Sequence, residues 1–358
     1  MKSRLKLLAL GITAATASCN QSPTTILSQA TSCPLPEFSS EFRFGLVAFH
    51  IPYQHYRLYP GDFPIIARSG VNSLSIDFAW RDIEPEPGKF DFRYYDMIME
   101  NAEINGLEVI PKVGNGYNKE RATVPEWTKS LDREEYNQAL ARYTQAIVER
   151  YGEQVKAYSL ENEANFWATH INLNWREGDW DRERVFTIWE TLSRTLRQTD
   201  PEAELILSLS GDKLGEWLAE INQRIDYDTV GLQIYPSWLI GPPNASSAEN
   251  RIREIAQASG KPVMVLETGY HTAMLRPDSA QGEYVQSMLT AAIKGGAKGV
   301  FFYTYLENPY EEKGNERYFG MVKQDRTPKA GFKRYQEINQ ACRFDPELAL
   351  NSRASLPH

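Results

Sequence analysis

The sequence predicts an α/β fold, a single (β/α)8 TIM barrel in which eight parallel strands each lead into a helix. Short apolar segments rich in β-branched and aromatic residues alternate eight times with longer amphipathic segments. Alternation of this kind implies parallel strands joined by helical crossovers. The repeats fill roughly 300 residues, which suits a closed barrel with insertions. An open doubly wound sheet, the alternative, would ordinarily carry a glycine-rich phosphate loop after its first strand, and FHIPYQHYRLYPGD is not one.

The eight predicted strands are short and mostly apolar. They are expected at residues 44–49, 72–79, 107–112, 156–161, 204–210, 229–235, 263–267 and 299–304. The segments between them have the period of amphipathic helices, for example residues 133–152 and 282–296, and several end in glycine, a common helix stop. We therefore assign one barrel to residues 41–342, preceded by a polar linker at 19–40 and followed by a polar tail at 343–358.

Residues 1–18 have the composition of an export signal. Three basic residues fall within the first six positions, an apolar run follows, and small residues precede Cys19. The run is too short to span a bilayer. The segment resembles a bacterial lipoprotein signal, in which Cys19 would be acylated and become the mature N-terminus. Ordinary cleavage after Ala17 is the alternative.

The chain contains three cysteines, Cys19, Cys33 and Cys342. If Cys19 carries lipid, Cys33 and Cys342 are left to pair in an oxidising compartment and to tie the two ends of the chain together. Two unpaired thiols remain the alternative, because connectivity cannot be deduced from a sequence.

The charge of the chain excludes one large class of partner. The net charge is −8 at pH 7, and residues 1–18 contain only basic charges, so the chain without them is more acidic still. Such a surface does not suit nucleic acid, whose phosphates need a basic patch. No tract of about 18 apolar residues could span a bilayer. Contact with a membrane is therefore expected only through the lipid on Cys19.

Carboxylates stand at the ends of two predicted strands. Glu161 and Glu163 flank Asn162 where the fourth strand ends, and Glu267 ends the seventh strand after four apolar residues. Acidic residues are depleted in buried strands because desolvating a charge is costly. In barrels of this kind the reactive groups lie at the carboxyl ends of the strands. We therefore expect an active site there, with solvated loop or helix-capping acids as the alternative.

Strict alternation along a strand predicts which side chains share a face. It places two sets together: Val263, Val265 and Glu267 on the seventh strand, and Ala157, Ser159, Glu161 and Glu163 on the fourth. Carboxylates from these two non-adjacent strands would then converge over the mouth of the barrel.

Three motifs occur in an informative order. Asn162 and Glu163 end the fourth strand, Glu267 ends the seventh, and the segment WRDIEPEPGKFDFRYYD, residues 80–96, follows the second. In this placement the sequence resembles clan A of the glycoside hydrolases, the retaining β-glycosidases, from about residue 41 to 342.

The resemblance implies a reaction that uses two carboxyl groups. Retention at the anomeric carbon needs one ionised carboxylate to attack and one protonated carboxyl to protonate the departing oxygen. By resemblance Glu267 is the nucleophile, and Glu163 is the acid/base that later deprotonates the incoming water. Asn162 would hydrogen-bond the sugar 2-hydroxyl, and Tyr235 would donate to the nucleophile unless it is a core tyrosine. Glu161, deeper in the barrel, is expected to support the site.

Aromatic side chains near strand ends are candidates for binding the flat, C–H-rich faces of sugars. Trp80, Trp238 and Tyr303 are foremost, although Trp80 could instead hold the Glu-Pro loop in place. Asn115, after the third strand, is expected to line the pocket. His50 and His271 also fall at strand ends and are candidates for the same role, with a structural role as the alternative for each lone histidine. Further aromatic candidates are Tyr305, Trp167 and Trp175.

Three departures from clan A leave the sub-family and the first sugar subsite open. The second strand carries Asp77 where many members have Arg, and the eighth reads FFYTY where many place Trp. The third strand offers Lys112 and Asn115 where some families use His.

No metal site or cofactor is expected, because the histidines are scattered and no paired His or Cys spacing of the ligand type occurs. The leading hypothesis is an exported retaining β-glycoside hydrolase that acts on an oligo- or polysaccharide. A surface glycan-binding lipoprotein that kept the barrel and lost activity is the alternative, motivated by the three departures. A different barrel enzyme, such as a lyase or isomerase, is the third hypothesis.

Overall fold

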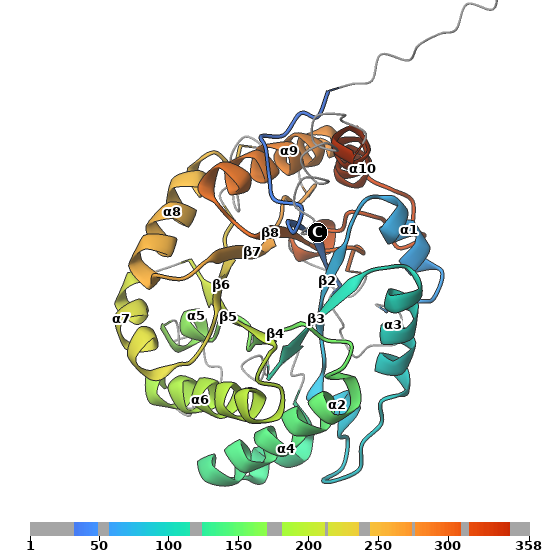
Figure 1. Cartoon of the computed structure of the whole chain (residues 1–358). Coiled ribbons are helices and arrows are strands. Elements are labelled where there is room, and N and C mark those ends of the chain that lie inside the picture. The colour runs from blue at the N-terminus through green and yellow to red at the C-terminus, as the bar shows by residue number, and fades with distance from the viewer. Residues whose placement is uncertain are drawn as a thin grey trace, which may run out of the picture. The chain divides into compact units, whose positions relative to one another are not determined.

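Eight parallel strands form a closed barrel in the order in which they occur along the chain (Figure 1). The computed structural model describes residues 32–48, 57–114, 124–169, 181–211, 214–235, 244–273, 276–308 and 315–343. The strands are β1 (Arg43–Ala48), β2 (Ser73–Asp77), β3 (Glu108–Val113), β4 (Ala157–Leu160), β5 (Glu204–Ser210), β6 (Thr229–Gln233), β7 (Val263–Thr268) and β8 (Gly299–Tyr303). Pairing of β1 with β8 closes the ring. The predicted (β/α)8 barrel is confirmed, and each predicted strand overlaps an observed one.

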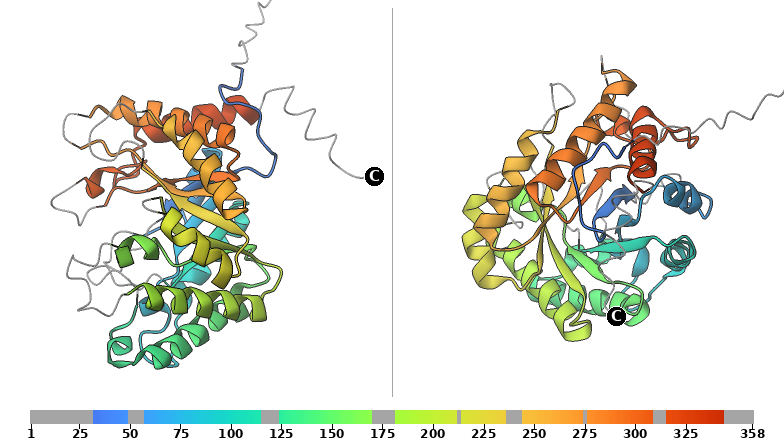
Figure 2. Two further views of the ribbon diagram at one scale, coloured as in Figure 1. Left: turned by 90° about the vertical axis from the view of Figure 1, so that its left-hand side faces the viewer. Right: turned by 45° about the horizontal axis from the view of Figure 1, so that its top comes forward.

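Helices surround the barrel, as the two further views in Figure 2 also show. They are α1 (Asp62–Arg68), α2 (Trp80–Ile83), α3 (Arg93–Ile104), α4 (Arg133–Tyr151), α5 (Ala164–Thr169), α6 (Arg182–Thr199), α7 (Gly215–Arg224), α8 (Ser247–Ser259), α9 (Asp278–Gly295) and α10 (Ala330–Arg343), with 3-10 turns at η1 (Glu126–Ser130) and η3 (Glu316–Tyr318). A capping box formed by Asp132 and Glu135 begins α4 and satisfies backbone donors that would otherwise lack partners. Among the described helices, none is both long enough and apolar enough to cross a membrane.

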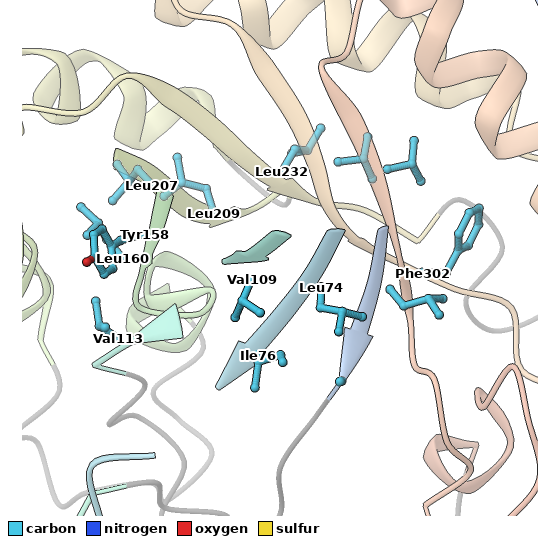
Figure 3. Packing of buried hydrophobic residues seen from close by; sticks show 14 of the residues in the cluster. Leu74, Ile76, Val109, Val113, Tyr158, Leu160, Leu207, Leu209, Leu232 and Phe302 are labelled. Carbon is cyan, nitrogen blue, oxygen red and sulfur yellow. The ribbon is translucent and has the colours of Figure 1, made fainter. Parts of the chain in front are cut away.

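Apolar side chains form an outer and an inner core. The outer core lies between the barrel and its helices, and Figure 3 shows strand residues that belong to it, such as Leu74, Tyr158 and Leu207. The inner core fills the barrel itself and includes Ala157 and Ile206. Because successive strand side chains point to opposite faces, most strands contribute to both cores, whereas the apolar side chains of β2 and β6 belong to the outer core alone.

Charged side chains cross the amino-terminal end of the barrel. Arg43 donates from Nε and Nη2 to the two carboxylate oxygens of Glu108, each at 2.8 Å, and from Nη1 to Glu204 at 2.7 Å. Glu204 also accepts hydrogen bonds from Thr229 and Lys298, both at 2.5 Å. Burial alone would raise the pKa of Glu204, but hydrogen bonds from Lys298, Thr229 and Arg43 lower it to about 2. These contacts join β1, β3 and β5 across the barrel and close this end.

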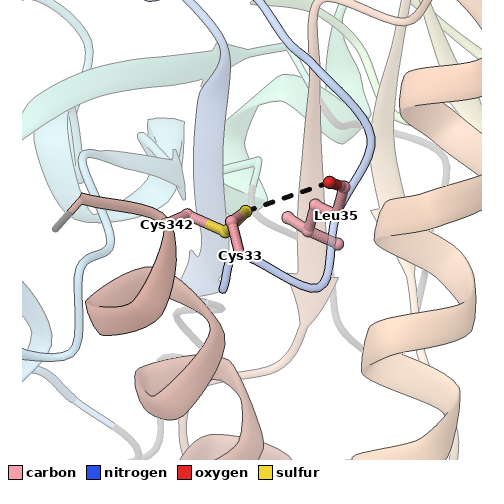
Figure 4. The surroundings of a disulfide bond; sticks show 3 residues. All are labelled: Cys33, Leu35 and Cys342. Atoms are coloured by element: carbon pink, nitrogen blue, oxygen red, sulfur yellow. Dashed lines mark hydrogen bonds between the residues drawn. A yellow bond between two sulfur atoms is a disulfide. The ribbon is translucent and has the colours of Figure 1, made fainter. Parts of the chain in front are cut away.

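A disulfide joins Cys33 to Cys342 in α10, and this is the pairing that the sequence left open (Figure 4). It closes a loop of 309 residues, for which chain-entropy reasoning gives a stabilisation on the order of 5 kcal/mol. Residues 32–40, expected as part of a polar linker, pack against the barrel. Leu35 belongs to the outer core, and Phe38 contacts the rings of Phe42 and Phe44.

Candidate active site

Glu267 reaches the barrel interior through an irregularity in β7. Along β7, Val263 and Val265 belong to the outer core, whereas Met264 and Leu266 belong to the inner core. Strict alternation would therefore point Glu267 at the helices. The register between β6 and β7 shifts at this point, so that Gln233 is opposite Glu267. Such a bulge adds a residue and turns the side chains that follow it.

This geometry corrects one step of the sequence-based prediction. Glu267 was expected to share a face with Val263 and Val265, and it does not. The bulge reverses its direction, and its carboxylate meets Lys112 of β3, a strand on another part of the ring.

The end of β4 departs from strand geometry in a second way. The strand ends at Leu160, and Glu161 and Glu163 both adopt left-handed backbone conformations, with φ of 55° and 53°. This conformation costs roughly 1–2 kcal/mol for a residue with a side chain. The alternation expected to carry from Ala157 to Glu163 therefore stops at Leu160.

Glu161, Asn162 and Glu163 differ in how deeply their side chains are buried. Glu161 is fully buried and lies against Gly114, where an added Cβ would come within 2.8 Å of Glu161 Oε1. Asn162 is buried, and Glu163 is half-buried. Deep burial of Glu161 agrees with the supporting role expected for it.

The carboxylate of Glu267 is held from two sides. Its Oε1 accepts a hydrogen bond from the Tyr235 hydroxyl at 2.6 Å, and its Oε2 lies 3.4 Å from Lys112 Nζ. Burial and the adjacent Glu267 charge raise the pKa of Tyr235 well above its ordinary value. Tyr235 therefore stays protonated and donates. Glu267 keeps 8% of its surface exposed.

Asn162 is fixed by side chains from two other strands. Its Oδ1 accepts from Lys112 Nζ at 3.2 Å and from the amide of Gln233. The same Gln233 amide donates to Ser208 of β5 at 2.7 Å. Asn162, Glu267 and Tyr235, three of the residues expected to act together, are thus linked in one network.

Tyr303 and Phe319 lie beside this network. The ring of Phe319 contacts both Tyr235 and Tyr303, with centroid distances of 5.7 and 5.6 Å. Tyr303 is buried at the end of β8. Tyr303 therefore lies near this network through Phe319, and its contact with a sugar stays a prediction.

Trp80 does not serve as a surface for a sugar. Its ring is fully buried, stacks on Tyr143 at 5.1 Å and donates from Nε1 to Glu84 at 2.6 Å. Glu84 in turn accepts from the backbone of Gly88 at 2.7 Å. The structure supports the alternative in which Trp80 holds the Glu-Pro loop. Tyr305 is also buried, and its hydroxyl donates to Asp62.

Several predicted residues lie outside the described part of the chain. These are Cys19, His50, Asn115, Trp175 and Trp238, together with the side chain of Trp167. Within the described residues, no group of three His, Cys, Asp or Glu side chains is placed to hold a metal ion.

A family model described as glycosyl hydrolase family 53 matches residues 114–306, more than half of the chain. The chain belongs to glycosyl hydrolase family 53. A model described as a β-galactosidase of family 42 matches residues 55–131. Both models describe glycoside hydrolases.

Solved structures show the same fold for this family 53 chain. An exo-β-1,4-mannosidase from Opitutaceae bacterium strain TAV5 is 15% identical over 88% of this chain and 61% of its own, with a TM-score of 0.64. A family 1 β-glucosidase from Thermotoga maritima is 14% identical over 85% and 99%, with a TM-score of 0.68. A family 39 glycoside hydrolase from Bacteroides cellulosilyticus WH2 is 18% identical over 86% and 65%, with a TM-score of 0.60. The chain spans less than two thirds of the mannosidase and of the family 39 enzyme.

Three residues of this network had no assigned role from sequence. Lys112 and Asp77 were noted only as departures, and the structure pairs them, with Nζ 3.9 Å from Asp77 Oδ1. Gln233 was not singled out. These residues are polar side chains inside otherwise apolar strands, and that pattern could have revealed them. Such groups are rarely buried without partners, so each one indicates a polar contact in the interior.

Proposed function

We propose that this chain is a retaining β-glycosidase that hydrolyses an O-glycosidic bond of an oligo- or polysaccharide by double displacement. Glu267 is the nucleophile and Glu163 is the acid/base. The observation that carries the proposal is the setting of Glu267, which β7 turns inward, leaves slightly exposed and presents to the Tyr235 hydroxyl and the Lys112 ammonium. Both partners favour the carboxylate form, and an ionised carboxylate is what the attack requires.

The proposed reaction has two steps, formation of a covalent glycosyl-enzyme and its hydrolysis. A carboxylate oxygen of Glu267 bonds to the anomeric carbon while the bond to the leaving oxygen breaks and Glu163 gives that oxygen its proton. In the second step, Glu163 takes a proton from water, whose oxygen bonds to the anomeric carbon and releases Glu267. Glu163 directly follows Asn162, which is two hydrogen bonds from Glu267 through Lys112.

Azide separates the two roles experimentally. A panel of dinitrophenyl β-galactoside, β-glucoside and β-mannoside is assayed with Glu267→Ala and Glu163→Ala. We expect Glu267→Ala to lose about 10³–10⁶-fold in kcat, since the nucleophile is gone. Azide then restores turnover and yields an α-glycosyl azide. Glu163→Ala forms the glycosyl-enzyme with such good leaving groups, and azide converts it to a β-glycosyl azide.

The matched control is Glu134→Ala, which removes an exposed glutamate at the start of α4. It should retain wild-type turnover. Full activity of Glu267→Ala would exclude Glu267 as nucleophile, and identical azide products from both variants would refute the division of roles.

We propose further that the protein is exported, with residues 1–18 as signal and Cys19 as the lipid attachment point. The disulfide between Cys33 and Cys342 supports an oxidising compartment. Labelling of cells with radioactive palmitate should mark the wild-type chain and leave Cys19→Ala unlabelled. Equal labelling of both would refute lipidation at this position.

A further inference from the structure

We propose that Lys112, paired with Asp77, is a positioning residue that sets both the charge state of Glu267 and the orientation of the Asn162 amide. The inference rests on the proposed function, because it concerns how the nucleophile and its neighbour are held. Lys112 lies on β3, Asp77 on β2, and the groups that Lys112 positions follow β4 and end β7. The Lys112 side chain therefore contacts residues from three other parts of the barrel.

The Lys112 ammonium lies at the centre of three polar contacts. Its Nζ is 3.2 Å from Asn162 Oδ1, 3.4 Å from Glu267 Oε2 and 3.9 Å from Asp77 Oδ1. The lysine side chain has no exposed surface. A buried ammonium is retained only where anions and hydrogen-bond acceptors replace water.

Acidic groups predominate around this ammonium. Asp77 faces it from β2 and Glu267 from β7, while buried Glu161 lies against Gly114, two residues after Lys112. The neighbouring hydroxyl groups stay protonated: burial and the charges of Asp77 and Glu161 raise the pKa of Tyr143 well above its ordinary value, and Tyr235 behaves likewise. Among the described residues, Lys112 is the cation within ion-pair distance of Glu267. Its charge favours the ionised nucleophile, and Asp77 competes for it.

The chemistry of an ammonium group also decides how Asn162 is oriented. Lysine donates hydrogen bonds and accepts none, so the Asn162 atom facing Nζ must be the carbonyl oxygen. Gln233 donates to the same oxygen and is fixed by Ser208. The NH₂ group of Asn162 is consequently turned away from Lys112 and acts as a donor on the other side. A sugar hydroxyl that meets it must accept.

The first experiment measures kcat/KM as a function of pH. Its substrate is the dinitrophenyl β-glycoside that the wild type hydrolyses fastest among the three in the panel. Lys112→Met should move the acid limb to higher pH, because the ionised nucleophile loses the cation that lies 3.4 Å away. Asp77→Asn should move the limb to lower pH, because it removes a competing anion. Lys112→Arg, which keeps the charge, should restore the wild-type limb in part.

The second experiment compares that glycoside with its 2-deoxy counterpart. If Lys112 orients Asn162, the advantage of the 2-hydroxyl in kcat/KM should fall at least about tenfold in Lys112→Met. A structural role for the lysine would lower both rates and leave their ratio unchanged. Lys298→Met, at the opposite end of the barrel, is the control and should keep both the limb and the ratio.

The outcomes separate this inference from the proposed function. A wild-type acid limb and ratio in Lys112→Met, together with an inactive Glu267→Ala, would overturn the inference and leave the proposed function standing. Full turnover by Glu267→Ala would remove both. If Lys112→Met does not fold, Asp77→Asn decides, because an unchanged or upward-shifted acid limb contradicts the competition between the two carboxylates.

Discussion

The two ends of the barrel differ in how their buried charged side chains are paired. At the amino-terminal end, Arg43 and Lys298 meet Glu108 and Glu204, and each carboxylate oxygen accepts at least one hydrogen bond of 2.5–2.8 Å. At the carboxyl-terminal end, Lys112 lies 3.4 Å from Glu267 and 3.9 Å from Asp77, and the buried carboxylate of Glu161 lies against Gly114, two residues after Lys112. The first end neutralises its charges through short contacts, whereas the second keeps an excess of anions around one shared ammonium.

The backbone shows the same contrast. The register from β1 through β3 is regular from the amino-terminal end onward. Near the carboxyl ends, the pairing of β7 shifts against both neighbours, and Glu161 and Glu163 take left-handed conformations. Departures from local preference that persist in a native fold concentrate at functional sites. The amino-terminal end therefore has the features of a stabilising framework, and the carboxyl-terminal end has those of the proposed active site.

The largest effect should come from Glu267→Gln, which changes the carboxyl-terminal end of the barrel. We expect kcat to fall by about 10³–10⁶-fold, because an amide cannot attack the anomeric carbon. The free energy of unfolding should change by less than about 1 kcal/mol, since Lys112 still pairs with Asp77. Steady-state assays and urea unfolding measure the two quantities. A large loss of stability would show that Glu267 is part of the framework.

Glu204→Gln should produce the converse result. The pKa of Glu204 is lowered to about 2 in the folded state. Its ionised form therefore stabilises the fold above the unfolded-state pKa near 4.3, and this contribution disappears as the pH falls toward 2. We expect Glu204→Gln to lose about 2–3 kcal/mol at pH 7 and to have a flatter stability profile between pH 4 and 2. Turnover of the folded variant should match the wild type. Reduced kcat with unchanged stability would contradict the assignment.

Tyr235→Phe should give the smallest of the three effects. A hydrogen bond to a charged group contributes roughly 1.5–3 kcal/mol, so we expect kcat to fall about 10–100-fold. Tyr305→Phe is a matched control, because Tyr305 also donates from a buried hydroxyl to a carboxylate, that of Asp62. It should alter thermal stability and spare kcat. Equal losses of kcat in the two variants would indicate a general packing effect.

Regular features of the chain were predictable, and contacts between distant strands were not. Eight apolar segments identified the barrel, and Glu267 at the end of one of them indicated a candidate site at the carboxyl ends of the strands. The direction of Glu267 depends on a bulge against β6, which no local pattern encodes. The partners of Lys112 come from three other strands, and Trp80 is buried by Tyr143, far along the chain. Pairing of Cys33 with Cys342 likewise depends on where the completed barrel places α10.

The disulfide has a topological consequence. Because a disulfide bond joins Cys33 to Cys342, the polypeptide between them is a covalent ring. A protease that cuts one exposed loop opens this ring without releasing a fragment, so the severed pieces remain a single molecule and can stay folded. A closed ring therefore tolerates one cleavage that would divide a linear chain into two separate fragments.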